Sequence, residues 1–227
     1  MKPVPPLIGQ IQTSIERHKS GMNRLWPKYT LSLSKTSKFL LNAQKRTGNK
    51  TSNYGISIEK DMVKKGAETY LGKLRSNFVG TEFCLFNAGE NAKNAKGTDD
   101  LREQLGVVQY ETNVLGSKGP RRMKVLLPMV YRDGNVRLWK SKEDKDSISE
   151  VFKSGQTEDL MFFFNKPPKW NEQVQAFVLN FNGRVDKASV KNFQLIDEYD
   201  DNRIYMQFGR VGQNEFNMDV AFPMSIF

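Results

Sequence analysis

The chain has 227 residues, enough for one large domain or two small ones with a buried core. Lys plus Arg number 35 against 25 for Asp plus Glu, so the formal net charge is +10. That balance favours an anionic partner: nucleic acid, an anionic membrane surface or an acidic protein. No apolar run is long enough to cross a bilayer, and the N-terminus has no apolar signal core, so we expect a cytoplasmic protein.

The side chains that most enzymes and zinc sites need are scarce. Cys84 is the only cysteine and His18 the only histidine, which excludes an intrachain disulfide and a zinc site of recognisable spacing. A nucleophilic mechanism would depend on His18 alone. No phosphate-binding glycine loop and no nucleophile-elbow motif occurs. We therefore expect no enzymatic activity, no cofactor and no metal.

The predicted elements are almost all strands. Residues 1–10 contain three prolines and are predicted to form a flexible lead-in. Short stretches of alternating apolar and polar residues then predict strands at 11–15, 29–33, 38–41, 54–58, 70–77, 83–86, 107–110, 122–127, 160–164, 177–182, 204–208 and 216–222. The first stretch also fits one face of a helix. Residues 90–100 are predicted to be a mobile loop, and 130–159 an excursion from the core. This pattern indicates an antiparallel all-β barrel or sandwich.

One predicted strand carries two cations on one face. Lys73 and Arg75 are two residues apart, so their side chains project in the same direction. Asn53 stands at the start of another predicted strand, on its outward side. Two cations held at this spacing suit an anionic group with several oxygens, such as a phosphate. The alternative is a solvated outer face with ordinary surface charge.

A basic, turn-rich loop precedes Asn53 and contains Lys45, Arg46 and Lys50. The pattern of this loop is equally consistent with an auxiliary anion-binding surface and with a polar hairpin tip. Arg102 follows the predicted mobile loop. From the sequence pattern alone it is an ordinary exposed residue that pairs with Glu103 or Asp99.

Several segments, taken in order, resemble the tubby domain family. They are Lys50–Tyr54 (KTSNY), Gly72–Asn77 (GKLRSN), Tyr110–Gly116 (YETNVLG), Gly119–Met123 (GPRRM), Leu179–Val185 (LNFNGRV), Ala188–Gln194 (ASVKNFQ) and Gln207–Val211 (QFGRV). The resemblance extends over residues 11–227. It implies a closed all-β, mostly antiparallel barrel of about twelve strands around a central apolar helix.

The resemblance also implies a surface site for phosphoinositides, chiefly phosphatidylinositol 4,5-bisphosphate. Its head group would be held by Asn53, Lys73, Arg75 and Arg102, with Lys45, Arg46 and Lys50 as auxiliary cations that face the membrane. At Leu101–Leu105 the chain reads LREQL where the family reads L-R-x-E-L, but the arginine is present. A monomer that tethers reversibly to the plasma or ciliary membrane would follow, with a role as a ciliary trafficking adaptor.

Two features depart from the family pattern. The chain stops at Phe222–Phe227, where the central helix would begin, so that helix is expected to be absent from the tubby domain predicted at 11–227. The lead-in is also shorter than the segment by which adaptors of the family bind ciliary transport machinery. Two other functions therefore stay open: a ciliary structural or interaction protein, and a nucleic-acid-binding transcription regulator that reaches the nucleus.

Overall fold

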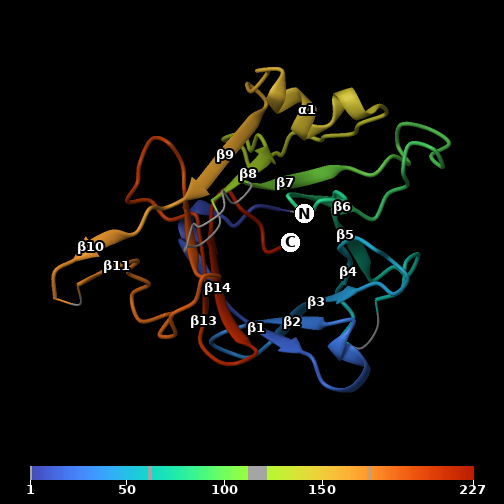
Figure 1. The fold of residues 1–227 in the computed structure, drawn as a ribbon. Coiled ribbons are helices and arrows are strands. Elements are labelled where there is room, and N and C mark those ends of the chain that lie inside the picture. Colours follow the sequence, from blue (N-terminus) through green and yellow to red (C-terminus); the bar gives the residue numbers. More distant parts are fainter. Residues whose placement is uncertain (1, 61–62, 112–121, 174) are drawn as a thin grey trace.

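Twelve strands hydrogen-bond side by side in a closed ring, which Figure 1 shows as a barrel. The computed structural model describes residues 2–60, 63–111, 122–173 and 175–227. Around the ring the order is β1, β14, β13, β12, β9, β8, β7, β6, β5, β4, β3 and β2, and every pair is antiparallel. The predicted all-β closed barrel is confirmed, and the first stretch is a strand rather than a helix.

The barrel strands are β1 (Gln10–His18), β2 (Lys28–Leu33), β3 (Phe39–Lys45), β4 (Asn53–Ser57), β5 (Tyr70–Ser76), β6 (Glu82–Asn87), β7 (Gln104–Tyr110), β8 (Met123–Pro128), β9 (Leu160–Asn165), β12 (Phe193–Ile196), β13 (Met206–Arg210) and β14 (Glu215–Ala221). Outside the ring are one short helix, α1 (Ile148–Lys153), and the hairpin β10 (Lys169–Asn171) with β11 (Ala176–Val178). Single 3₁₀ turns are η1 (Pro6–Ile8), η2 (Gly21–Arg24) and η3 (Asp144–Asp146).

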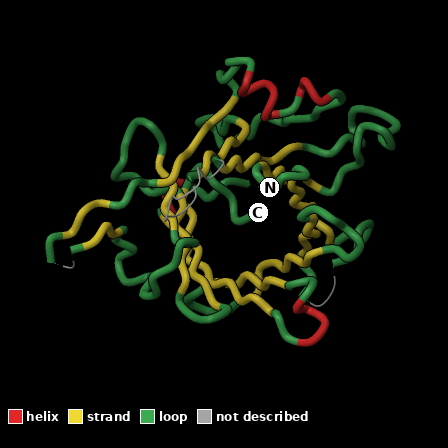
Figure 2. Tube along the Cα trace, viewed as in Figure 1, coloured by secondary structure: helices red, strands yellow, loops and turns green. Residues whose placement is uncertain are grey.

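Side-chain alternation separates two apolar clusters on the two faces of the sheet. Val125 belongs to a cluster that also contains Val4 and Met224, near the two ends of the chain. Its neighbour Leu126 belongs to a second cluster, together with Ile148 of α1. The chain ends lie within the outline of the ring and α1 lies outside it (Figures 1 and 2). The first cluster therefore fills the barrel interior, and the second covers the outer wall.

No helix occupies the barrel interior in the described part of the chain. Within these residues no helix is long and apolar enough to span a membrane. The interior is instead lined by the first cluster, and the backbone N–H of Val4 donates to the Met224 carbonyl at 2.8 Å. The lead-in and the last residues therefore pack against the same core.

Strand direction assigns each connection to one end of the barrel. The connections β1–β2, β3–β4, β5–β6, β9–β12 and β13–β14 lie at one end, which we call the site rim. The connections β2–β3, β4–β5, β6–β7, β8–β9 and β12–β13 lie at the other end, the far rim. Surface residues can therefore be compared by the rim on which they stand.

Two segments differ from the sequence prediction. The strand expected at 177–182 is only β11, which pairs with β10 outside the ring, because the chain turns away after Val178. The excursion at 130–159 is not detached from a core: Ile148 is fully buried and helps form the outer-wall cluster. Its polar sequence conceals that packing, since only a few of its residues point at the barrel. The family-like residues 112–121 lie outside the described residues.

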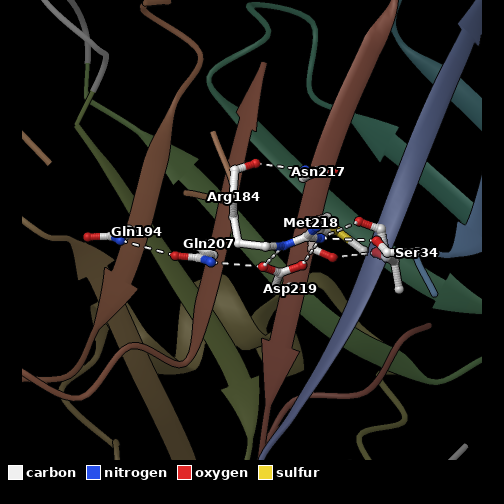
Figure 3. A network of polar contacts seen from close by, with 8 residues as sticks. Ser34, Arg184, Gln194, Gln207, Asn217, Met218 and Asp219 are labelled. Carbon is white, nitrogen blue, oxygen red and sulfur yellow. Dashed lines mark hydrogen bonds and ion pairs between the residues drawn. The ribbon is translucent and has the colours of Figure 1, made fainter. Parts of the chain in front are cut away.

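A polar network crosses the outer wall from β12 to β1 (Figure 3). Asp219 is fully buried, and the Arg184 Nε and Nη2 atoms donate to its two carboxylate oxygens at 2.8 and 2.6 Å. Gln207 Nε2 also donates to Asp219 at 2.8 Å, and Gln194 Nε2 donates to Gln207 Oε1 at 3.2 Å. A buried carboxylate needs such partners. The network therefore offsets the cost of burying this charge.

Candidate anion-binding site

Strand register brings three of the predicted site residues together on the outer wall. Asn53 of β4 lies directly opposite Arg75 of β5, and Gly55 lies opposite Lys73. Directly opposite residues point to the same face, with Cβ atoms about 5 Å apart. Arg75 is in turn opposite Cys84, which packs on the outer-wall cluster. Asn53, Lys73 and Arg75 therefore share the outer face, as side-chain alternation predicts.

Arg102 joins this group from a different segment. Phe86 of β6 lies opposite Lys73, and the Arg102 guanidinium carbon stands 4.0 Å from the centre of the Phe86 ring. A guanidinium at that distance makes a cation–π contact. The Arg102 backbone is held by a hydrogen bond from its N–H to the Glu90 carbonyl at 2.8 Å. Gly89 permits this approach, because a Cβ there would lie 2.6 Å from the Arg102 Cα.

The auxiliary cations are distributed unevenly. Arg46 lies at the site, with its guanidinium carbon 5.8 Å from the centre of the Tyr70 ring. Lys45 lies opposite Tyr54, which places it on the inner face of the sheet. Lys50 is exposed in the turn before β4. Lys65, which was not predicted, also stands near Lys73 and pairs with Glu90 at 3.3 Å.

The cations of this cluster have few counter-charges. Neither Lys73 nor Arg75 makes a hydrogen bond or ion pair with any residue that the structure describes. The pKa of Lys73 is lowered from 10.5 to about 8, first by burial and then by the charges of Arg102, Arg75, Lys65 and Arg46. Burial and Arg75 likewise lower the pKa of Arg102. The site therefore holds positive charge that an anion would stabilise.

Two polar atoms beside these cations are buried without a partner among the described residues, Asn53 Oδ1 and Tyr70 Oη. Asn53 Nδ2 donates to Asn49 Oδ1 at 3.1 Å, which holds the amide in place. Burial raises the pKa of Tyr70, so its hydroxyl keeps its proton and can donate. An unpaired buried polar atom costs free energy, and a polar ligand would recover that cost.

Cys84, opposite Arg75, is a potential nucleophile beside these cations. Burial raises the pKa of Cys84 to about 12, so its thiol is a poor nucleophile. Among the described residues no group of three or more His, Cys, Asp or Glu is arranged to hold a metal ion. The arrangement can bind and orient an anion with several oxygens.

A second hollow differs from this site in its charge. A cavity of about 690 Å³ lies between the β10–β11 hairpin and the outer wall, and Arg184, Lys169 and Trp170 are among its lining residues. Arg184 is paired with Asp219, and Lys169 Nζ is 3.7 Å from Asp201. Lys166 also lines this cavity, but two of its three cations already have carboxylate partners, so it is less suited to an anion than the cluster at Lys73.

The protein is thus a closed antiparallel barrel with a cationic site on its outer wall, and its function has to be argued from that site rather than from the barrel itself. The sequence model of the Tub family matches residues 1–227. The chain therefore belongs to the Tub family, which confirms the resemblance drawn from its motifs.

Similar proteins carry tubby names. The chain is 42% identical to Tubby protein homolog 1 of Caenorhabditis briggsae over 224 residues, 93% of this chain and 53% of that protein. It is 40% identical to Tubby-related protein 1 of Mus musculus, over 94% of this chain and 40% of that protein. It is also 40% identical to Protein king tubby of Drosophila grimshawi, over 99% of this chain and 50% of that protein. The chain thus spans about half the length, or less, of these relatives, and none of the three names denotes an enzyme.

Proposed function

We propose that the cluster of Lys73, Arg75, Arg102 and Asn53 binds the head group of a phosphoinositide, and that this binding tethers the protein reversibly to an anionic membrane. The observation that carries the proposal is the charge of the site. Three cations from two segments converge on one face, and neither Lys73 nor Arg75 has a carboxylate partner among the described residues. Membership of the Tub family supports it. A plasma or ciliary membrane, and a role in trafficking there, are part of the proposal.

The physical terms are sufficient for reversible tethering. Each charge-assisted hydrogen bond to a phosphate contributes about 1.5–3 kcal/mol. Cations near an anionic bilayer, such as Arg46 and Lys50, add about 1 kcal/mol each, and this part weakens with salt. Two or three head-group contacts together with this attraction correspond to micromolar binding, on the order of 8 kcal/mol. Hydrolysis of the lipid phosphates would then release the protein.

Liposome co-sedimentation tests the proposal. Vesicles of phosphatidylcholine with one phosphoinositide at a time are compared for the wild type and for Lys73→Ala/Arg75→Ala. The control is Lys142→Ala/Lys145→Ala, which removes the same charge from the exposed segment before α1 at the far rim. A thermal melt of each protein establishes that it is folded.

Selective binding by the wild type and the control, lost in the folded Lys73→Ala/Arg75→Ala protein, supports the proposal. Equal loss in both double variants would mean that only net charge matters. The net charge of +10 would then favour the nucleic-acid alternative, which predicts a steep salt dependence of binding to duplex DNA. Equal binding by all three proteins would leave a structural or interaction role.

A further inference from the structure

The turn that follows the cationic strand presents two large apolar side chains to solvent. Phe78 and Val79 lie between β5 and β6, and they are 87% and 76% exposed. Single exposed apolar residues are common and need no explanation. This pair is distinguished by its setting, because it stands at the site rim and begins three residues after Arg75.

The turn is rigidly built. The Asn77 side chain accepts three backbone N–H groups through its Oδ1 atom, from Gly80 at 2.8 Å, Thr81 at 3.0 Å and Glu82 at 3.3 Å. Its Nδ2 atom donates to the Thr81 hydroxyl at 3.0 Å. Gly80 has a φ of 75°, which glycine adopts without strain. A turn held in this way keeps both apolar side chains in solvent at a fixed position, where a flexible loop could fold them away.

The turn is also free of charge. Residues 77–81 read NFVGT, so no ionised side chain would lose water if the tip entered an apolar layer. Phe78 lies at most about 10 Å along the chain from Arg75. Interfacial segments bury their apolar side chains about 5–10 Å into the boundary between head groups and acyl chains. The chain between Arg75 and Phe78 is therefore long enough for Arg75 to hold a head group while the tip of the turn inserts beside it.

We propose that Phe78 and Val79 insert into the head-group boundary of the bilayer when the cationic site holds its lipid. The partner is thus the bilayer itself, and head-group recognition supplies only part of the affinity. This inference rests on the proposed function, since the continuity of the turn with the head-group site identifies lipid as the partner. It also gives the protein one preferred orientation, with the β5–β6 turn and the outer wall beside Arg75 against the membrane.

Full burial of a Phe or Val side chain contributes enough free energy for about a tenfold change in a binding constant. Phe78→Ser/Val79→Ser is therefore expected to weaken binding to vesicles that contain phosphatidylinositol 4,5-bisphosphate by about tenfold or more. Its affinity for soluble inositol trisphosphate, measured by calorimetry, is expected to be unchanged, because no bilayer is present. Both side chains are exposed, so the fold should tolerate the changes.

The matched control is Leu138→Ser/Tyr199→Ser. These residues are 64% and 87% exposed but stand in the β8–β9 and β12–β13 connections, at the far rim. This variant is expected to bind vesicles as the wild type does. As a direct readout, a tryptophan at position 78 (F78W) should be quenched by lipids brominated near the head group, whereas Y199W should not.

The outcomes separate the two proposals. Unchanged vesicle binding by Phe78→Ser/Val79→Ser, with normal binding of inositol trisphosphate, would overturn insertion and leave the proposed function standing. Equal weakening by the control variant would also overturn it, since any exposed apolar residue would then have the same effect. A wild type that binds neither inositol trisphosphate nor the vesicles would overturn the proposed function, and insertion with it.

Discussion

Replacing Lys73 by methionine removes a charge that the folded protein holds at a cost. The pKa of Lys73 falls from 10.5 to about 8 in the folded state, mainly by burial and then by Arg102 and Arg75. Between these two pH values the unfolded chain keeps a proton that the folded chain has lost, so stability rises with pH through this window. At neutral pH, below the window, the full cost of the charge is present. The whole shift corresponds to about 3 kcal/mol, and partial exposure reduces this to on the order of 1 kcal/mol.

Lys73→Met is therefore expected to be about 1 kcal/mol more stable than the wild type at neutral pH. The difference should shrink above the folded-state pKa of about 8, where the wild-type lysine is already neutral. Urea unfolding at neutral pH and at a pH above that pKa measures both values. Lys38→Met, at an exposed turn of the far rim, is the control. A Lys73→Met protein less stable than the wild type at neutral pH would refute the reasoning, because the lysine would then stabilise the fold.

Three further outcomes are expected. Affinity for soluble inositol trisphosphate should fall as pH rises above about 8, because Lys73 of the ligand-free protein loses its proton there. Lys73→Arg should abolish this pH dependence. A wild-type affinity that does not change with pH would contradict the prediction. Arg102→Leu should weaken vesicle binding by about tenfold to a hundredfold in co-sedimentation, since one charge-assisted contact is lost; an unchanged affinity would remove Arg102 from the site. Arg184→Met should lower the unfolding free energy by about 3 kcal/mol, because it leaves the Asp219 carboxylate buried without its cation. Arg137→Met, which breaks an exposed ion pair, should lower it by less than about 1 kcal/mol. Similar urea midpoints for the two variants would contradict this difference.

The sequence was most informative where the local period determines the structure. Side-chain alternation along 70–77 was enough to place Lys73 and Arg75 on one face, and β5 has that alternation. It was less informative where position depends on contacts between distant segments. The stacking of Arg102 on Phe86 depends on the close approach that Gly89 permits, and no periodic pattern carries that information.

Other parts of the site were missed or misplaced for related physical reasons. Lys65 lies in a polar segment without alternation, so its approach to Lys73 follows only from the folded connection between β4 and β5. Lys45 and Arg46 are adjacent in sequence, and the charge of the segment predicts the same membrane-facing role for both. Adjacent strand residues point to opposite faces, and the register places Lys45 on the inner one. The sequence shows that this segment is positively charged, but only the pairing of the strands shows on which face of the sheet each cation lies.

A crystal structure of the protein with soluble inositol trisphosphate would test head-group binding at Lys73 directly. We expect phosphate oxygens within hydrogen-bonding distance of Lys73 and Arg75, with Asn53 and Arg102 completing the contacts. Lys73→Ala/Arg75→Ala, crystallised under the same conditions, should show no ligand there. A head group bound at another basic surface of the wild type, with the cluster at Lys73 unchanged, would contradict the proposed site.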